Sequence, residues 1–125
     1  MKKVIMTANA PKPVGPYSQA ILVGQTLYCS GQIAIDPKTN EVLKGSVKEE
    51  AELVMKNIGA VLKEAGMSYE NIIKTNIFLI SMGDFGAVNE VYGQYFKADP
   101  PARSTIAVKE LPKGVQVEIE VVAYR

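Results

Sequence analysis

The 125-residue chain carries 14 basic and 13 acidic side chains, and 47% of its residues are hydrophobic, which is typical of one globular domain spanning residues 1–125. The near balance of charge, with no long block of either sign, disfavours a nucleic-acid partner. A single cysteine cannot form an internal disulfide, and no stretch approaches the length of a membrane span, so a cytoplasmic protein with no membrane partner is expected.

Histidine is absent, which excludes nucleophilic systems that depend on a histidine base and removes the commonest zinc ligand. With one cysteine and no glycine-rich phosphate loop, neither a metal nor a cofactor is expected. Any chemistry must therefore use Arg, Glu, Tyr, Ser and Thr side chains, backbone groups and water.

The first part of the chain predicts short strands around a tight turn. Three prolines and a glycine make residues 8–16 an extended loop. Gly24-Gln25 suits the two central positions of a type II′ hairpin turn. The strands expected here span residues 3–7, 17–23 and 26–30, and residues 31–35 are interpreted as a continuation of the sheet.

The first helix has the strongest signals. Ser46 and Glu49 form a capping box, and Gly66 is placed just past the helix end. Gly59 inside the helix is expected to allow close packing on a sheet. The residues that recur at helical spacing and define the buried stripe are Val47, Ala51, Val54, Ile58, Leu62 and Ala65. The charged residues expected to form a solvated face are Lys48, Glu49, Glu50 and Glu52.

The second half predicts a central strand over residues 72–80 and a helix from Asp84 to Lys97. Strands over 104–108 and 115–124, joined by a turn at 111–114, are expected to pair antiparallel. Together the elements predict an α+β sandwich in which a mixed β-sheet carries two helices packed on one face. The other face combines Glu118 and Glu120 with apolar residues, so it faces water or other subunits.

Arg103 and Glu118 are the most informative residues. Arg103 follows two prolines near the start of one strand, and Glu118 interrupts a β-branched run in the next. An arginine fork holds a carboxylate through two hydrogen bonds, and a nearby acid handles protons, so the pair suggests a site for a small carboxylic acid. The alternative is an ordinary ion pair across a sheet, and strand register decides whether the two side chains share a face.

Other polar residues leave two interpretations open. Tyr17 and Ser30 flank chain-bending glycines and prolines, so they line a cleft rim or serve turn chemistry and sheet packing. Asn89 has poor helix propensity, so it caps a backbone group or faces a pocket. Cys29 is expected to pack as a small hydrophobic residue, because nothing nearby in sequence would lower its pKa.

Several motifs together resemble the reactive intermediate deaminase family, RidA, also called the YjgF family. They run in order through nearly the whole chain: Gly15-Pro16-Tyr17-Ser18-Gln19-Ala20, Ser30-Gly31-Gln32-Ile33, Asp84-Phe85, Val88-Asn89, Pro101-Ala102-Arg103-Ser104, and Leu111-Pro112-Lys113 followed by Val117-Glu118-Ile119-Glu120.

The resemblance implies a chorismate-mutase-like fold, a homotrimer with clefts between subunits, and cofactor-free hydrolysis of 2-imino acids and their enamine tautomers to 2-oxo acids and ammonia. It implies that Arg103 binds the substrate carboxylate and that Glu118 positions water and handles protons. Cleft-lining positions fall on Tyr17, Ser30, Gly31 and Asn89. Thr105 stands where many bacterial members carry cysteine, which argues against a nucleophile there and leaves a hydroxyl for the ligand.

Two other functions compete with the deaminase. A sensor would hold small carboxylates without useful catalysis, but it has no need for the acid at Glu118. Cleavage of RNA, ascribed to some members of the family, is disfavoured by the near-neutral charge and the absence of histidine.

Overall fold

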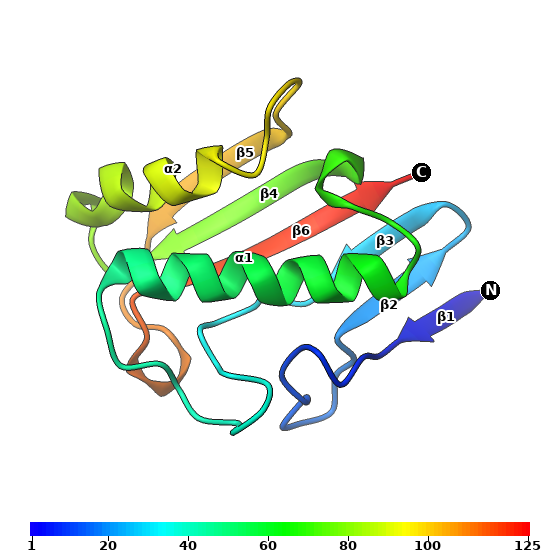
Figure 1. The fold of residues 1–125 in the computed structure, drawn as a ribbon, viewed down its shortest axis with the longest axis horizontal. Coiled ribbons are helices and arrows are strands. Elements are labelled where there is room, and N and C mark those ends of the chain that lie inside the picture. Colours follow the sequence, from blue (N-terminus) through cyan, green and yellow to red (C-terminus); the bar gives the residue numbers. More distant parts are fainter.

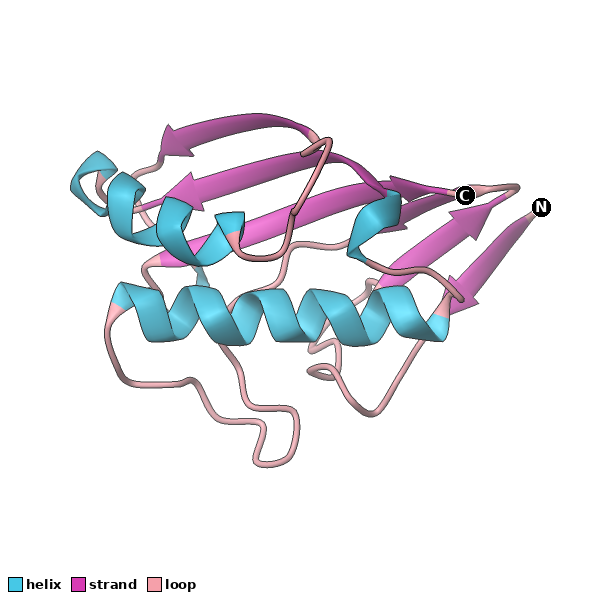
Figure 2. Cartoon of the chain, turned by 45° about the horizontal axis from the view of Figure 1, so that its top comes forward, coloured by secondary structure: helices cyan, strands magenta, loops and turns pink.

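Six strands form one mixed sheet in the computed structural model, which describes residues 1–125 (Figure 1). The strands are β1 (Lys2–Ile5), β2 (Ala20–Val23), β3 (Thr26–Cys29), β4 (Ile72–Leu79), β5 (Ala102–Ala107) and β6 (Val117–Tyr124). Their order is β1-β2-β3-β6-β4-β5, and only β4 and β5 run parallel. Figure 2 shows both helices on the same side of the sheet, which confirms the predicted α+β layers.

Helix α1 (Val47–Glu64) begins as its sequence predicts. The Ser46 hydroxyl accepts from the Glu49 N–H at 3.2 Å, and the Glu49 carboxylate accepts from the Ser46 N–H at 2.8 Å. Gly66 follows the helix with φ +74°, a conformation that glycine adopts without steric cost. Every residue of the predicted apolar stripe is buried against the sheet.

Two expectations about α1 are wrong. Gly59 makes room for a tyrosine rather than for the sheet, because a Cβ there would overlap the Tyr69 hydroxyl, which donates to the Met55 carbonyl at 2.7 Å. Tyr69 comes from a 3₁₀ turn (Tyr69–Asn71) that follows the helix. Glu50 is buried rather than solvated, because its carboxylate turns inward and accepts from Gln116.

Helix α2 (Phe85–Gly93) is shorter than predicted, since it ends four residues before Lys97. Asp84 makes no capping hydrogen bond because its own backbone is helical and belongs to a preceding 3₁₀ turn (Met82–Asp84). The Ser81 hydroxyl accepts from the Gly83 N–H at 3.1 Å instead. Val88 and Tyr92 are buried, as expected for the inner side of this helix.

The predicted antiparallel pairing of the last two strands is wrong. β5 runs parallel to β4 because α2 carries the chain back across the sheet, and β6 lies between β3 and β4. Alternate residues of β6 are buried, namely Val117, Ile119, Val121 and Ala123, and such a strand suits a central position. β5 contains no buried residue and forms the sheet edge.

The predicted hairpin is confirmed, with strands that start and end slightly differently. Val23 pairs with Thr26, and positive φ occurs at Gly24 but not at Gln25, as a type II′ turn requires. Residues 31–35 do not form a strand, because only Gln32 keeps a bridge to β6 before the chain leaves the sheet. β1 and β2 are shorter than the predicted 3–7 and 17–23.

The sheet separates a covered face from an open one. The hydrophobic core lies between the sheet and the two helices that Figure 2 shows on one side of it. Neither helix has the length and apolar character needed to cross a bilayer. Several large apolar side chains remain exposed on the strands, including Val4, Tyr28, Ile106 and Tyr124. The strand register places these side chains on the face opposite the helices, and apolar residues that gather on one face are typical of an interaction surface.

Candidate functional site

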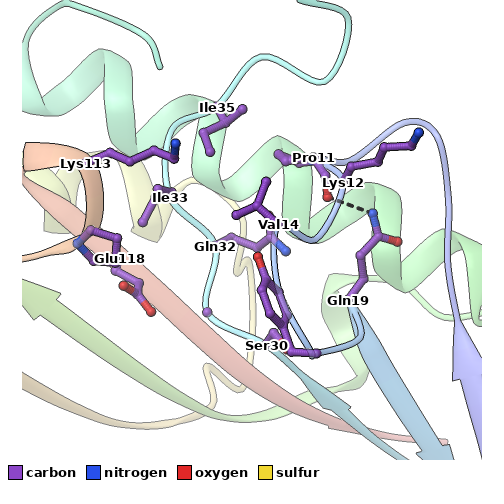
Figure 3. A pocket seen from close by; sticks show the side chains of 13 residues that line it. Pro11, Lys12, Val14, Gln19, Ser30, Gln32, Ile33, Ile35, Lys113 and Glu118 are labelled. Atoms are coloured by element: carbon purple, nitrogen blue, oxygen red, sulfur yellow. Dashed lines mark hydrogen bonds between the residues drawn. The ribbon is translucent and has the colours of Figure 1, made fainter. Parts of the chain in front are cut away.

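A cavity of about 430 Å³ lies beside the start of β6 (Figure 3). Its lining residues come from three loops and one strand: Pro11, Lys12, Val14, Tyr17, Gln19, Ser30, Gly31, Gln32, Ile33, Ile35, Pro112, Lys113 and Glu118. Figure 3 shows Glu118 and Lys113 on one wall and Pro11 and Gln19 on the opposite wall. Four of the predicted site residues therefore share this cavity, which we call the Glu118 cavity.

Glu118 is the acid of the cavity. Burial, and secondarily the negative charge of Glu120, raises the pKa of the Glu118 carboxyl above its usual value. The carboxylate occupies the space in front of Gly31, where a Cβ would overlap Oε2 and lie 2.9 Å from Cδ. Because Gly31 has no side chain, the Glu118 carboxylate can lie directly against the Gly31 backbone.

Ser30 is held by hydrogen bonds to the residues that precede β2. Its hydroxyl donates to the Ser18 carbonyl at 2.6 Å, and its N–H donates to the Gln19 carbonyl at 2.9 Å. Tyr17 lines the cavity from the loop before β2 and is half exposed. Both residues line the cavity, and the two hydrogen bonds of Ser30 also serve the local turn, so the structure is compatible with both interpretations that the sequence left open.

Gln19 and Lys113 belong to the cavity but were not singled out from sequence. The buried Gln19 amide accepts from the Thr7 N–H at 2.7 Å and donates to the Pro11 carbonyl at 2.9 Å, a bond drawn in Figure 3. Lys113 has φ +57°, a strained backbone for a residue with a side chain. The sequence signal for both residues was their place in the motifs Gly15-Pro16-Tyr17-Ser18-Gln19-Ala20 and Leu111-Pro112-Lys113.

Arg103 lies in a different place, on β5 beneath α2. Its Nη1 donates to Asn89 Oδ1 at 2.5 Å, and its Cζ lies 5.4 Å from the Phe85 ring centre and 5.1 Å from the Tyr92 ring centre. The Tyr92 hydroxyl is 2.9 Å from Thr75 Oγ1. Two rings and one amide thus orient the guanidinium, and Asn89 faces Arg103 rather than capping its helix.

Arg103 and Asn89 also line a second cavity, of about 530 Å³, between α2 and the prolines that precede β5. Thr105 lies two residues further along β5, on the same side as Arg103. Its Oγ1 is buried and has no hydrogen-bond partner within the chain. Buried hydroxyls are normally satisfied, so this atom is unusual, and Thr105 is not among the residues that line either cavity.

One chain does not bring Arg103 and Glu118 together. Arg103 pairs with Thr75, whose side chain contacts α2, whereas Glu118 alternates with buried residues that face α1. The two side chains therefore project from opposite faces of the sheet, with β4 between their strands. The alternative interpretation, an ordinary ion pair across neighbouring strands, is wrong because β5 and β6 are not neighbours.

Cys29 takes no part in either cavity. It is buried at the end of β3, and burial raises the pKa of its thiol to about 12. This confirms the prediction of a small core residue without nucleophilic character.

Comparison with known proteins identifies the family. The family model described as Endoribonuclease L-PSP matches residues 7–125. The chain belongs to this family, which is the RidA (YjgF) family indicated by its motifs. A RutC family protein of Pyrococcus horikoshii is 51% identical over 100% of this chain and 99% of its own. A human protein named 2-iminobutanoate/2-iminopropanoate deaminase is 50% identical over 98% of this chain and 90% of its own.

A solved structure extends the likeness to the fold of the RidA family. The Rid family protein of Yersinia pestis superposes with a TM-score of 0.98, at 47% identity and with 100% of both chains covered.

Proposed function

We propose that this RidA family chain hydrolyses 2-imino acids, such as 2-iminobutanoate and 2-iminopropanoate, to 2-oxo acids and ammonia, and so protects pyridoxal-phosphate enzymes from these reactive intermediates. The observation that carries the proposal is the half-buried carboxylate of Glu118, set against Gly31 in a cavity large enough for such a substrate. The name of the human relative at 50% identity supports this chemistry.

The proposed site is shared between copies of the chain. Arg103 and Glu118 project from opposite faces of one sheet, so a single substrate meets both only if they come from different subunits. We propose the homotrimer that the resemblance implies, in the chorismate-mutase-like arrangement, with a cleft at each subunit boundary. The exposed apolar side chains of the open face support such an assembly.

In the proposed mechanism, Arg103 binds the substrate carboxylate through two charged hydrogen bonds and fixes the position of C2. Glu118 accepts a proton from water as the water oxygen attacks C2, and the electrons of the C=N bond move to nitrogen. Glu118 then delivers that proton to nitrogen. In the second step the C–N bond breaks, the hydroxyl proton passes through Glu118 to the leaving nitrogen, and the 2-oxo acid and ammonia remain.

The remaining residues have supporting roles in this proposal. Asn89 and the two rings hold the Arg103 guanidinium before substrate arrives, which reduces the entropy lost on binding. We assign to the unpartnered Thr105 hydroxyl, on the Arg103 side, a hydrogen bond to the bound substrate. Tyr17, Ser30 and Gly31 shape the wall around Glu118. Imines hydrolyse readily, so positioning and one acid–base group, worth about 10²–10⁴-fold, suffice.

The test is ammonia release from 2-iminobutanoate generated in the assay by a dehydratase, with semicarbazide as the competing trap. Wild type is expected to accelerate release, and Arg103→Ala to lose about 10²-fold in kcat/KM because two charged hydrogen bonds disappear. Arg125→Ala is the matched control, because Arg125 donates to the Ala65 carbonyl outside both cavities.

The outcomes separate the deaminase from its competitors. Carboxylate binding by wild type without faster ammonia release would contradict the deaminase and favour a small-carboxylate sensor. RNA cleavage with a steep salt dependence would favour the nuclease that the family description names. Equal turnover of Arg103→Ala and Arg125→Ala would remove Arg103 from the mechanism.

A further inference from the structure

Glu50 is the only acidic or basic residue of the chain that is buried, at 4% exposure. It lies in the first turn of α1, and no cation pairs with it, since the chain's single ion pair joins Lys48 and Glu90. An unpaired buried carboxylate is costly unless hydrogen bonds satisfy both oxygens.

Both Glu50 oxygens are satisfied by one residue. Oε1 accepts from the Gln116 backbone N–H at 2.9 Å, and Oε2 accepts from Gln116 Nε2 at 2.8 Å. Gln116 Nε2 also approaches the Gly45 carbonyl at 3.3 Å. Hydrogen bonds to a charged acceptor are about twice as strong as neutral ones, so the two bonds clamp Gln116 firmly to α1.

Gln116 occupies the middle of the segment that supplies one wall of the Glu118 cavity. Pro112 and Lys113 precede it, Glu118 follows it by two residues, and all three line the cavity. The turn before it contains two consecutive residues with positive φ, Lys113 at +57° and Gly114 at +70°. Lys113 is strained in this conformation, whereas Gly114 is not, and a strained residue persists only where the surrounding structure fixes it.

We propose that Glu50 is a positioning residue for Glu118: its clamp on Gln116 sets where β6 begins and so fixes the Glu118 carboxylate against Gly31. This inference rests on the proposed deaminase function for its kinetic consequence. A carboxylate is suited to this role, because it can accept from the backbone and the side chain of Gln116 at once. Neither an apolar residue nor a single hydroxyl there would hold both donors.

The experiment compares Glu50→Ala and Glu50→Gln with Glu52→Ala. Glu52 is the matched control, because it lies on the same helix and its carboxylate accepts from the Tyr95 hydroxyl, away from residues 112–118. We expect Glu50→Ala to lose about tenfold or more in kcat with a smaller change in KM. Glu50→Gln should stay within about threefold of wild type, because its amide oxygen still accepts from the Gln116 N–H.

Amide hydrogen exchange of residues 112–118 supplies a readout that does not depend on activity. Glu50→Ala should speed exchange at the Gln116 N–H by about tenfold or more, while Glu52→Ala leaves it at the wild-type rate. Equal exchange in the two alanine variants would overturn the clamp, whatever the kinetics. Faster exchange with an unchanged kcat would overturn the positioning role, and inactive wild type would contradict the deaminase instead.

Discussion

The Glu118 cavity and the Arg103 region are built in opposite ways. Three loops and the start of β6 make the Glu118 cavity, and buried polar side chains hold two of these segments: Gln19 binds the first loop, and Glu50 binds Gln116. Regular elements make the Arg103 region, where a strand, a helix and two aromatic rings hold the guanidinium. The acid group thus depends on long-range hydrogen bonds for its position, and the cation depends on packing.

The first prediction tests whether these two regions act on one substrate from different subunits, and it has the largest expected effect. Arg103→Ala and Glu118→Gln should each be nearly inactive. When the two variants are unfolded together and refolded as a mixture, activity should return to about a quarter of wild type, since half of the subunits supply each intact group. The measurement is ammonia release before and after mixing.

The control for this mixing experiment is each variant refolded alone, which should stay inactive. If the mixture also stays inactive while mixed trimers form, Arg103 and Glu118 do not complete one site from two subunits.

The second prediction tests how much activity is lost when the Glu118 carboxylate is displaced. Gly31→Ala puts a Cβ into the space that the carboxylate occupies, so the side chain must move. We expect kcat to fall by about 10²-fold, as misplacement by about 1 Å can cause. Ammonia-release kinetics measure the loss.

Gly86→Ala provides the comparison for Gly31→Ala. A Cβ at Gly86 in α2 meets nothing within 4 Å, so this variant should keep full activity and gain about 0.5–1 kcal/mol in stability. Equal activity in the two variants would show that Glu118 tolerates displacement.

The third prediction concerns stability and has the smallest expected effect. Because burial raises the pKa of Glu118 above its ordinary 4.5, the folded protein holds this proton more tightly than the unfolded chain does. The group therefore favours folding at pH values below 4.5, and this contribution is lost as the pH rises through the raised pKa. Glu118→Gln should melt about 2 °C or less above wild type near pH 7.5.

At about pH 4 the advantage of Glu118→Gln should shrink, because wild-type Glu118 is then largely protonated. Melting curves at the two pH values test this, with Glu120→Gln as the neighbouring comparison. An advantage that is the same at both pH values would mean that the substitution acts through packing rather than through the charge.

The sequence predicted the features that depend on near neighbours. The capping box at Ser46, the apolar stripe of α1 and the alternation along β6 all follow from spacing within one element. The placement of Glu118 on the open face followed from that alternation. The motif around Arg103 predicted a functional role for this residue, which stays a prediction until the kinetic experiments are done.

The features that sequence reasoning missed depend on distant partners. A turn at residues 111–114 looked like a hairpin, but β4 offers β6 a fully paired, buried position that β5 does not. Glu50 resembled its solvated neighbours, and its partner Gln116 lies 66 residues away. Gln19 likewise binds backbone groups that lie 8 and 12 residues earlier in the connection between β1 and β2. The spacing of residues within one element does not indicate such contacts.

The burial of Cys29 has a practical consequence for anyone who wishes to follow this molecule in solution. The chain has no other thiol, and this one is both enclosed and held in its protonated form. A maleimide dye should therefore find almost nothing to react with in the natural protein. A cysteine introduced at an exposed position on the helix side of the sheet, such as Lys56 in α1, would carry the label alone, so energy transfer between donor- and acceptor-labelled chains could report assembly directly.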